Sequence, residues 1–512
     1  MRSHILALAI AATLPVVAVA QPSALPPGSP STAVTLPDTP IGRLGQQFLD
    51  AIDARDSAAV ARFVALHLGR DVRGRSPAQM AFMLTKLHAQ SGGLRLQHFE
   101  MAGSAIRMMT QAKNGTKWMA MELEPAGGDS TRISGVTMVP LDQPRMGGPR
   151  QPWAIGSLDD DQIAAIIRTK VKAAADSDRF SGVVLVAHGD RMLVHRAYGY
   201  ADREAGRPNG LETPFATYSM GKMFTSVAIA QLVAQGKLSF DDTLAKVLPS
   251  YPNTEAAKQV TIRQLLTHTA GVPDVFLSKR FDLKKSYASH LAMLPDFADA
   301  PLNANHGKSF DYSNGNFAVL AAVVEQLSGL RYDEYLARNV FGPAGMKLPD
   351  EKTAVGYARF TELDPLGVEP RRSERVRGGG GGDTAAKSRP LGFGGGAYTA
   401  EDLFRFARAL RTGKLVPMAI ADSITKGEVS MGGPAKYALG FFDRPFNDRR
   451  VVGHSGSNPD TGHDADLEMV WDGEWTVVVL SNYDAPAGMM LEMPILDLIA
   501  GSSKTGSAKV ER

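Results

Sequence analysis

Strand-like and helix-like segments follow a specific order in the longer, second part of the chain. A predicted helix beginning near Asp159 is followed by two strand-like segments, FSGVVLVAHGD and RMLVHRAYGYAD. Helical patterns dominate the middle, and strand patterns return in RVVGHSG, DLEMVWDGE and TVVVLSN, before an apolar helix over residues 489–499. Strands at both ends of a helical middle predict an α+β fold. We expect one antiparallel sheet with flanking helices, closed by the two ends of the domain, and an inserted helical subdomain.

A smaller unit is predicted ahead of this domain, over residues 41–141. Apolar residues recur at helical spacing from Ile41 to Ile52, and two more helical patterns follow over 59–68 and 77–88. Four strand-like segments then alternate with turn signals: LRLQHFEMA, IRMMTQA, KWMAMELEP and ISGVTMVPL. Helices followed by a strand meander predict a small α+β domain. Its order is similar to that of the nuclear-transport-factor-2-like group, and no acid–base pair stands out in it, so we expect an accessory packing or binding domain.

The first twenty residues have the form of a secretory signal. Arg2 and His4 precede an apolar run too short to span a bilayer, which ends in Ala18-Val19-Ala20. No later segment is long and apolar enough to suggest a transmembrane anchor. The chain has no cysteine, which excludes disulfides and a lipid-modified cysteine. We expect a cleaved signal peptide over 1–20 and a bacterial periplasmic or secreted protein.

The amino-acid composition predicts the boundaries of the other segments and limits the classes of partner and cofactor that we expect. Linkers are predicted over 21–40 and 142–157, the main domain over 158–501 and a tail over 502–512, with a Gly-rich basic insertion at Arg371–Lys387. The formal net charge is +3 without a dense basic stripe, so nucleic acid is not an expected partner. Neither metal-ligand spacing nor a phosphate-binding loop is present, so no metal or cofactor is expected. The oligomeric state is left open.

A serine and a lysine stand one helical turn apart at the start of the apolar segment ATYSMGKMFTSVAIAQLVAQG. Ser219 and Lys222 are three positions apart, so both side chains leave one face of a helix. A lysine amine kept neutral by its surroundings can accept the serine proton, which makes the hydroxyl a nucleophile. The spacing alone is weak support, because roughly two such pairs are expected by chance in a chain of this length. A second pair does occur, at Ser423 and Lys426.

Two later segments supply residue types that such a nucleophile needs. Tyr312 and Asn314 precede an apolar helix, where a tyrosine can carry protons and an amide can orient the lysine and a substrate. At the end of a predicted strand, Gly456 lets a substrate backbone approach, and the N–H groups of Ser457 and Ser219 can face a developing oxyanion. His454 in the same strand supplies a hydrogen bond and a partial charge. Two similar motifs, at Tyr251-Pro252-Asn253 and Lys504-Thr505-Gly506, lie on a Pro-rich turn and in the predicted tail, and are set aside.

Two further motifs have an architectural character. LLTHTAGVPD, which contains His268, is predicted to end a helix with a glycine turn, and His268 is interpreted as structural. In GFGGGAYTAEDL the glycines permit close backbone approach, and Thr399 is predicted to cap the following helix.

The order of these motifs resembles that of the serine β-lactamase/penicillin-binding superfamily, and most of all its class C-like branch of esterases, D-amino-acid peptidases and carboxypeptidases. The resemblance covers about residues 159–499. It implies that Ser219 is the acylated nucleophile, that Lys222 and Tyr312 share proton transfer, and that Asn314 orients the lysine and the substrate. His454 takes the place of the lysine in the family's Lys-Thr-Gly motif, with Gly456 and Ser457 beside the substrate. Which of Lys222 and Tyr312 is the general base is left open.

Histidine at position 454 narrows the expected substrate. In the superfamily that the chain resembles, a lysine at this position attracts the carboxylate of penicillins, whereas a mostly neutral imidazole attracts it less. The resemblance therefore implies a serine hydrolase acting on small esters, D-amino-acid peptides or β-lactam-like substrates, and an esterase or D-peptidase rather than an efficient β-lactamase. No group that would activate a deacylating water is evident in the sequence.

Two other functions fit parts of the sequence. A non-catalytic penicillin- or cell-wall-peptide-binding protein is the main alternative, although a binder has no need of Ser219, Lys222, Tyr312 and Asn314 together. An α/β-hydrolase requires a Gly-x-Ser-x-Gly turn. The segment around Ser219 lacks the first glycine and the segment 453–457 lacks the last, so that fold is not predicted.

Overall fold

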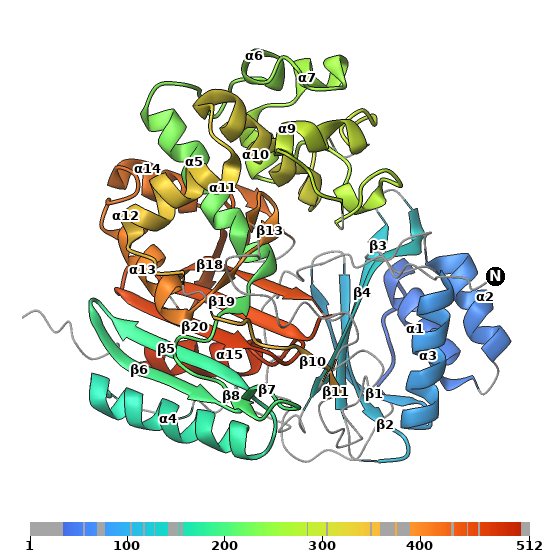
Figure 1. Ribbon diagram of the computed structural model, residues 1–512. Helices are drawn as coiled ribbons and strands as arrows, with labels where there is room; N and C mark the ends of the chain where they lie inside the picture. The colour runs from blue at the N-terminus through green and yellow to red at the C-terminus, as the bar shows by residue number, and fades with distance from the viewer. Residues whose placement is uncertain are drawn as a thin grey trace, which may run out of the picture. The chain divides into compact units, whose positions relative to one another are not determined.

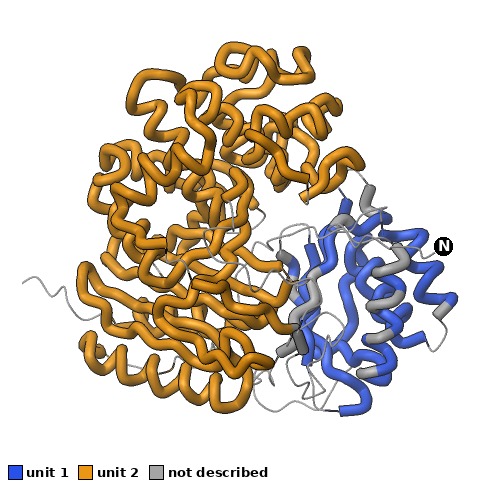
Figure 2. The backbone as a smooth tube through the Cα atoms, in the orientation of Figure 1, with its two compact units in different colours: residues 1–151, 360–372 blue, residues 152–359, 373–512 orange. Residues whose placement is uncertain are grey.

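The structure is a computed structural model that describes residues 34–54, 57–68, 77–102, 105–115, 118–126, 129–141, 153, 157–283, 285–303, 306–348, 351–358, 374–375, 390–431, 435–447, 449–458 and 461–502. The predicted signal peptide, most of both predicted linkers, most of the insertion Arg371–Lys387 and residues 503–512 of the tail lie outside these ranges. The chain forms two compact units (Figure 2), Met1–Gln151 with Phe360–Arg372, and Pro152–Arg359 with Ser373–Arg512.

The first unit packs three helices against a small antiparallel sheet. Its elements are α1 (Pro40–Asp53), α2 (Ser57–His67), α3 (Pro77–Ser91), β1 (Leu94–Ala102), β2 (Ala105–Ala112), β3 (Trp118–Ala126) and β4 (Asp129–Leu141). The strands pair in chain order, as the predicted meander requires. Thr39 caps α1, and the buried face of that helix, which includes Leu44 and Phe48, joins Met108 and Met121 in one core. The likeness of this unit to the nuclear-transport-factor-2-like group stays a prediction.

The second unit is organised around one antiparallel sheet of eight described strands. Their order is β15-β16-β17-β18-β19-β20-β5-β6. The bounds are β5 (Gly182–His188), β6 (Arg191–Tyr198), β15 (Val429–Ser430), β16 (Lys436–Tyr437), β17 (Phe442–Phe446), β18 (Arg449–Asn458), β19 (His463–Val470) and β20 (Trp475–Ser481). Strand β5 pairs with β20 from Gly182↔Ser481 to His188↔Trp475, so the two ends of the domain close the sheet. This confirms the predicted α+β fold with an antiparallel sheet.

Side-chain alternation gives this sheet two buried faces. In β5, Val183, Leu185 and Ala187 enter one apolar core, whereas Val184 and Val186 enter another. The second core is shared with α4 (Asp160–Asp176) and α15 (Met489–Ser502), and the first with α5 (Gly221–Ala234) and α13 (Ala400–Arg411). Figure 1 shows α4 beside β6. The sheet is therefore the middle layer of three.

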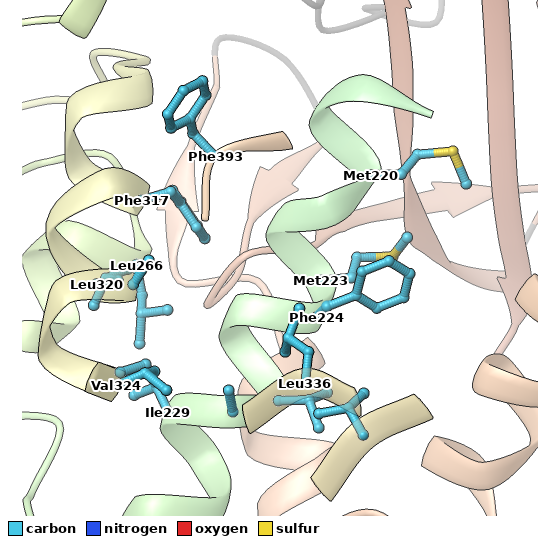
Figure 3. Packing of buried hydrophobic residues seen from close by; sticks show 14 of the residues in the cluster. Met220, Met223, Phe224, Ile229, Leu266, Phe317, Leu320, Val324, Leu336 and Phe393 are labelled. Atoms are coloured by element: carbon cyan, nitrogen blue, oxygen red, sulfur yellow. The ribbon is translucent and has the colours of Figure 1, made fainter. Parts of the chain in front are cut away.

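Helix α5 is the central element of the helical subdomain. Eleven of its residues are buried, among them the polar Lys222, Thr225 and Ser226, as expected for a helix in the core of the domain. Figure 3 shows Phe317, Leu320 and Val324 of α10 on one side of α5, while Met220 and Met223 extend toward the strands on the other.

The other α-helices and β-strands described in the second unit are α6 (Leu244–Val247), α7 (Thr254–Gln259), α8 (Ile262–Leu266), α9 (His290–Met293), α10 (Asn314–Ser328), α11 (Tyr332–Leu336), α12 (Gly342–Ala344), α14 (Met418–Thr425), β7 (Tyr200–Asp202), β8 (Arg207–Pro208), β9 (Phe215–Ala216), β10 (Tyr357–Ala358), β11 (Glu374–Arg375), β12 (Pro390–Leu391), β13 (Gly394–Gly395) and β14 (Ala397–Tyr398).

Two helix caps concern motifs of the sequence. Thr399 caps α13 in a capping box with Asp402, as the sequence predicts. The Tyr251-Pro252-Asn253 motif was predicted only to lie on a turn, and its Asn253 caps α7. Among the described residues, no helix combines the length and apolar character needed to cross a bilayer.

Candidate active site

Ser219 lies in a short 3₁₀ turn, Tyr218–Met220, immediately before α5. The sequence pattern predicts this serine at the start of the long helix, whereas the structure places it just ahead of that helix. Tyr218 has a left-handed backbone (φ 43°), which turns the chain sharply into the helix. The serine side chain is nevertheless within reach of Lys222 in the first turn of α5, as the spacing predicts.

Lys222 is fully buried and all three of its ammonium hydrogens have an acceptor. Its Nζ lies 3.1 Å from Ser219 Oγ, 2.9 Å from Asn314 Oδ1 and 2.6 Å from the carbonyl oxygen of Phe393. Burial lowers the pKa of this amine to about 7, although the Asp274 carboxylate acts in the opposite direction. The lysine is therefore poised to gain or lose a proton near neutral pH.

Tyr312 completes the surroundings of the serine oxygen. Its hydroxyl donates to Ser219 Oγ over 2.8 Å, and its ring centroid lies 4.7 Å from Lys222 Nζ. The tyrosine precedes α10, whose first residue is Asn314 and whose cap is Ser313. One serine oxygen thus lies between an amine and a phenol, each of which can move a proton.

Asp274 fixes the orientation of Asn314. One carboxylate oxygen, Oδ2, accepts from the Asn314 backbone N–H at 2.8 Å and from Asn314 Nδ2 at 2.9 Å. The amide nitrogen is therefore turned toward Asp274, and the amide oxygen faces Lys222. Sequence reasoning missed Asp274, although it lies in the motif LLTHTAGVPD; an acidic residue there is the only signal that was available.

The carbonyl group of Phe393 is a second contact that sequence reasoning missed. It belongs to the loop GFGGGAYTAEDL, whose glycines were predicted to allow close backbone approach. At Gly394 a Cβ atom would lie 2.9 Å from the Tyr218 carbonyl oxygen, so only glycine lets this loop pack against the Ser219 turn. Because every residue has a backbone carbonyl group, the residue type at position 393 does not indicate this contact, and the sequence could not reveal it.

Strand β18 approaches the serine through Gly456. A Cβ atom there would lie 2.0 Å from the Thr217 carbonyl oxygen and 2.9 Å from the Ser219 nitrogen. Pairing with β17 ends at Gly453, whereas β18 continues to Asn458, so residues 454–458 have no described strand on that side. Ser457 lies in this segment and is partly exposed. The alignment of an extended substrate along this segment stays a prediction.

His454 is turned away from solvent. It is fully buried, with Nε2 3.1 Å from the Tyr437 hydroxyl and Nδ1 2.6 Å from the Ser455 carbonyl oxygen, and its ring packs on Phe442. Burial, and next the charge of Lys222, lower its pKa to about 3, so the imidazole is neutral. A direct contact with substrate stays a prediction for His454, and its burial does not favour one.

The second serine–lysine pair has no comparable surroundings. Ser423 and Lys426 lie at the end of α14, where both are exposed. Among the described residues, no group of three or more potential ligands gathers in a way that could hold a metal ion.

The sheet, the inserted helices and the serine–lysine–tyrosine cluster define an α+β protein of the β-lactamase and penicillin-binding-protein class. The chain belongs to the Beta-lactamase family, whose profile matches residues 163–502.

Relatives with different names share this domain. Penicillin-binding protein 4* of Bacillus subtilis is 28% identical over 340 residues, which cover 62% of this chain and 71% of that protein. Esterase EstB of Burkholderia gladioli is 29% identical over 345 residues, covering 59% of this chain and 85% of the esterase. The crystal structure of a penicillin-binding protein from Bacillus halodurans is 29% identical with a TM-score of 0.51, and the match covers 65% of this chain and 97% of that one.

Proposed function

We propose that this protein is a serine hydrolase that cleaves ester or amide bonds through an acyl-enzyme on Ser219. The observation that carries the proposal is the contact of one serine oxygen with both Lys222 Nζ (3.1 Å) and Tyr312 Oη (2.8 Å). Small esters, D-amino-acid peptides and β-lactam-like compounds are the proposed substrates. The relatives named as an esterase and a penicillin-binding protein support this range.

In the proposed reaction, Ser219 Oγ attacks the substrate carbonyl carbon while its proton moves to a neighbouring base. A neutral Lys222 can accept that proton, because burial keeps its pKa near 7. Tyr312 donates its phenolic proton to the departing oxygen or nitrogen, so acylation ends with a Tyr312 phenolate, which can accept a proton from water, and a Lys222 ammonium, which can return one to Ser219 Oγ. The carbonyl C–O or C–N bond breaks, and an ester with Ser219 forms. Water then releases the acid by the reverse sequence of proton transfers.

The proposed oxyanion site is the pair of N–H groups of Ser219 and Ser457. The close approach of β18 at Gly456 supports this assignment, since it brings the strand against the Ser219 backbone. An esterase or D-peptidase is favoured over an efficient β-lactamase, because the family lysine is replaced by a neutral, buried His454.

The test is hydrolysis of a panel of p-nitrophenyl esters, D-amino-acid amides and a penicillin. Ser219→Ala is expected to abolish turnover, whereas the matched control Ser423→Ala, which removes the serine of the second pair, is expected to retain it. Unchanged hydrolysis by Ser219→Ala would overturn the proposal. Saturable peptide or penicillin binding without acylation, equal in wild type and Ser219→Ala, would support the alternative of a non-catalytic binding protein.

We further propose that the protein is exported, with residues 1–20 removed and residues 41–141 serving as an accessory domain. The basic start, apolar run and Ala18-Val19-Ala20 of the sequence support export. Mass measurement of the mature protein from its native host tests this: a chain that begins at Gln21 is expected, and a chain that retains Met1 would contradict it.

A further inference from the structure

The chain on both sides of Tyr312 is held by one residue, His268. The Asp311 N–H donates to the His268 carbonyl oxygen over 2.7 Å, and the Ser313 N–H donates to His268 Nδ1 over 3.2 Å. Tyr312 lies between these two donors. Backbone and side chain of a single residue therefore bracket the tyrosine.

The imidazole ring of His268 also packs against the phenol ring of Tyr312. The two ring centroids are 4.2 Å apart and the planes are inclined by 33°. His268 is fully buried, and its Nδ1 accepts a second hydrogen bond, from Asn316 Nδ2 at 3.1 Å. Two donors on Nδ1 place the proton of the neutral ring on Nε2. Burial, followed by the charge of Lys222, holds the pKa of His268 well below its usual value, which keeps the ring neutral.

Two features of His268 destabilise the folded state of the protein. Its backbone is left-handed (φ 57°), a conformation that is unfavourable for any residue with a Cβ atom. Its Nε2 is buried without a hydrogen-bond partner among the described residues, and an unpaired buried polar group destabilises the folded state. The sequence pattern predicts a glycine turn here, whereas helix α8 ends at Leu266 and the first left-handed residue after it is this histidine. Strain of this kind is often found where function requires it.

We propose that His268 is the positioning residue for Tyr312, and that it holds the phenol at hydrogen-bond distance from Ser219 through its Nδ1 acceptor and the face of its ring. This inference rests on the proposed function, since it concerns the same proton transfer. Tyr312 is only partly buried, and the closest described ring contact to it is that of His268. A displacement of about 1 Å at a reacting group can lower a rate by about 100-fold.

Two substitutions separate the acceptor from the rest of the side chain. His268→Gly keeps the left-handed backbone without strain but removes both Nδ1 and the ring. His268→Asn also tolerates that backbone, and its Oδ1 lies one bond beyond Cγ, as Nδ1 does. We expect His268→Gly to lower kcat for ester hydrolysis about 10- to 100-fold with little change in KM, and His268→Asn to recover most of that loss. His195→Asn, a half-buried histidine outside the site, is the matched control.

A double-mutant cycle with Tyr312→Phe gives the decisive comparison. If His268 acts through Tyr312, His268→Gly has no further effect on acylation of Ser219 once the phenolic hydroxyl is gone. Equal kcat in wild type and His268→Gly, or a loss that adds in full to that of Tyr312→Phe, would overturn the inference. The two failures are distinguishable: a wild type that is never acylated at Ser219 refutes the proposed function and this inference with it. If the wild type is acylated at Ser219 and His268→Gly has the same kcat as the wild type, only the role of His268 is refuted.

Discussion

Asn314 faces Lys222 with its amide oxygen because Asp274 binds its amide nitrogen. The Lys222 Nζ to Asn314 Oδ1 distance is 2.9 Å, and Asp274 Oδ2 accepts from both nitrogens of the asparagine. A partly buried carboxylate thus orients the group that accepts from the lysine, without touching Ser219 in any described contact.

Asp274→Asn is expected to lower kcat/KM for ester hydrolysis about tenfold, because the hydrogen bonds that orient Asn314 lose their charge. The Asp274 charge raises the pKa of Lys222, so its removal should also move the pH midpoint of acylation to lower pH. Stopped-flow acylation across pH measures both effects. Asp472→Asn, in the turn after β19, is the control, and a midpoint that moves to higher pH would contradict the assignment.

The pH dependence of the wild type follows from the buried lysine. Because the neutral amine is the form that accepts a proton, kcat/KM is expected to rise with pH through about 7, the pKa of Lys222. Lys222→Arg keeps the charge but cannot lose its proton near neutrality, so activity should fall by about 100-fold or more and the rising limb should disappear. A rising limb near pH 7 that persists in Lys222→Arg would assign the titration to another group.

The residues that the sequence predicted for the site and those that it missed differ in kind. Ser219, Lys222, Tyr312 and Asn314 carry side chains of distinctive chemistry in a fixed order, and the structure brings all four together. The carbonyl group of Phe393 has no such identity, because every residue has a carbonyl group. Contacts of this type depend on where a loop passes, which is decided by packing.

The fold was predictable where hydrophobic periodicity is strong. The apolar strands β5 and β20 at opposite ends of the domain were enough to predict a sheet closed by both. The surroundings of His454 were not, because its burial depends on Tyr437 and Phe442, which come from β16 and β17. Both strands are short, and neither the pairing of β16 with β17 nor that of β17 with β18 has a local sequence signal.

Gly456→Ala tests the approach of β18 to the serine. The added methyl group would overlap the Thr217 carbonyl oxygen, at 2.0 Å, so strand and turn must separate. We expect a loss of kcat/KM of about 100-fold. Ser455→Ala, one residue earlier in the strand, should remain close to wild type in the same ester assay. Equal activity of the two variants would show that the close approach is not needed.

A buried carboxylate cluster on the other face of the sheet predicts a pH-dependent stability. Asp464, Asp466 and Glu468 of β19 lie near Glu492 of α15, and Arg444 forms ion pairs with both glutamates. Burial raises the pKa of Asp464 to about 7 and that of Glu468 to about 8, and raises the pKa of Asp466 as well. In the unfolded chain such groups titrate at about pH 4. Between about pH 4 and 8 the folded state therefore binds more protons, and the stability due to the cluster falls as pH rises.

Asp466→Asn removes one of these charges while keeping its shape. We expect the variant to gain about 1–3 kcal/mol of unfolding free energy at pH 8 and clearly less at pH 5. Thermal unfolding of both proteins at the two pH values measures the difference. A gain that is larger at pH 5 than at pH 8 would contradict this pH dependence.

Acid quenching during turnover of a p-nitrophenyl ester, followed by intact mass and peptide mapping, identifies the nucleophile itself. We predict an added acyl group on the peptide that contains Ser219 in the wild type, and none in Ser219→Ala. Steady turnover with Ser219 unmodified, or an acyl group found on Ser423 instead, would contradict the proposed acyl-enzyme.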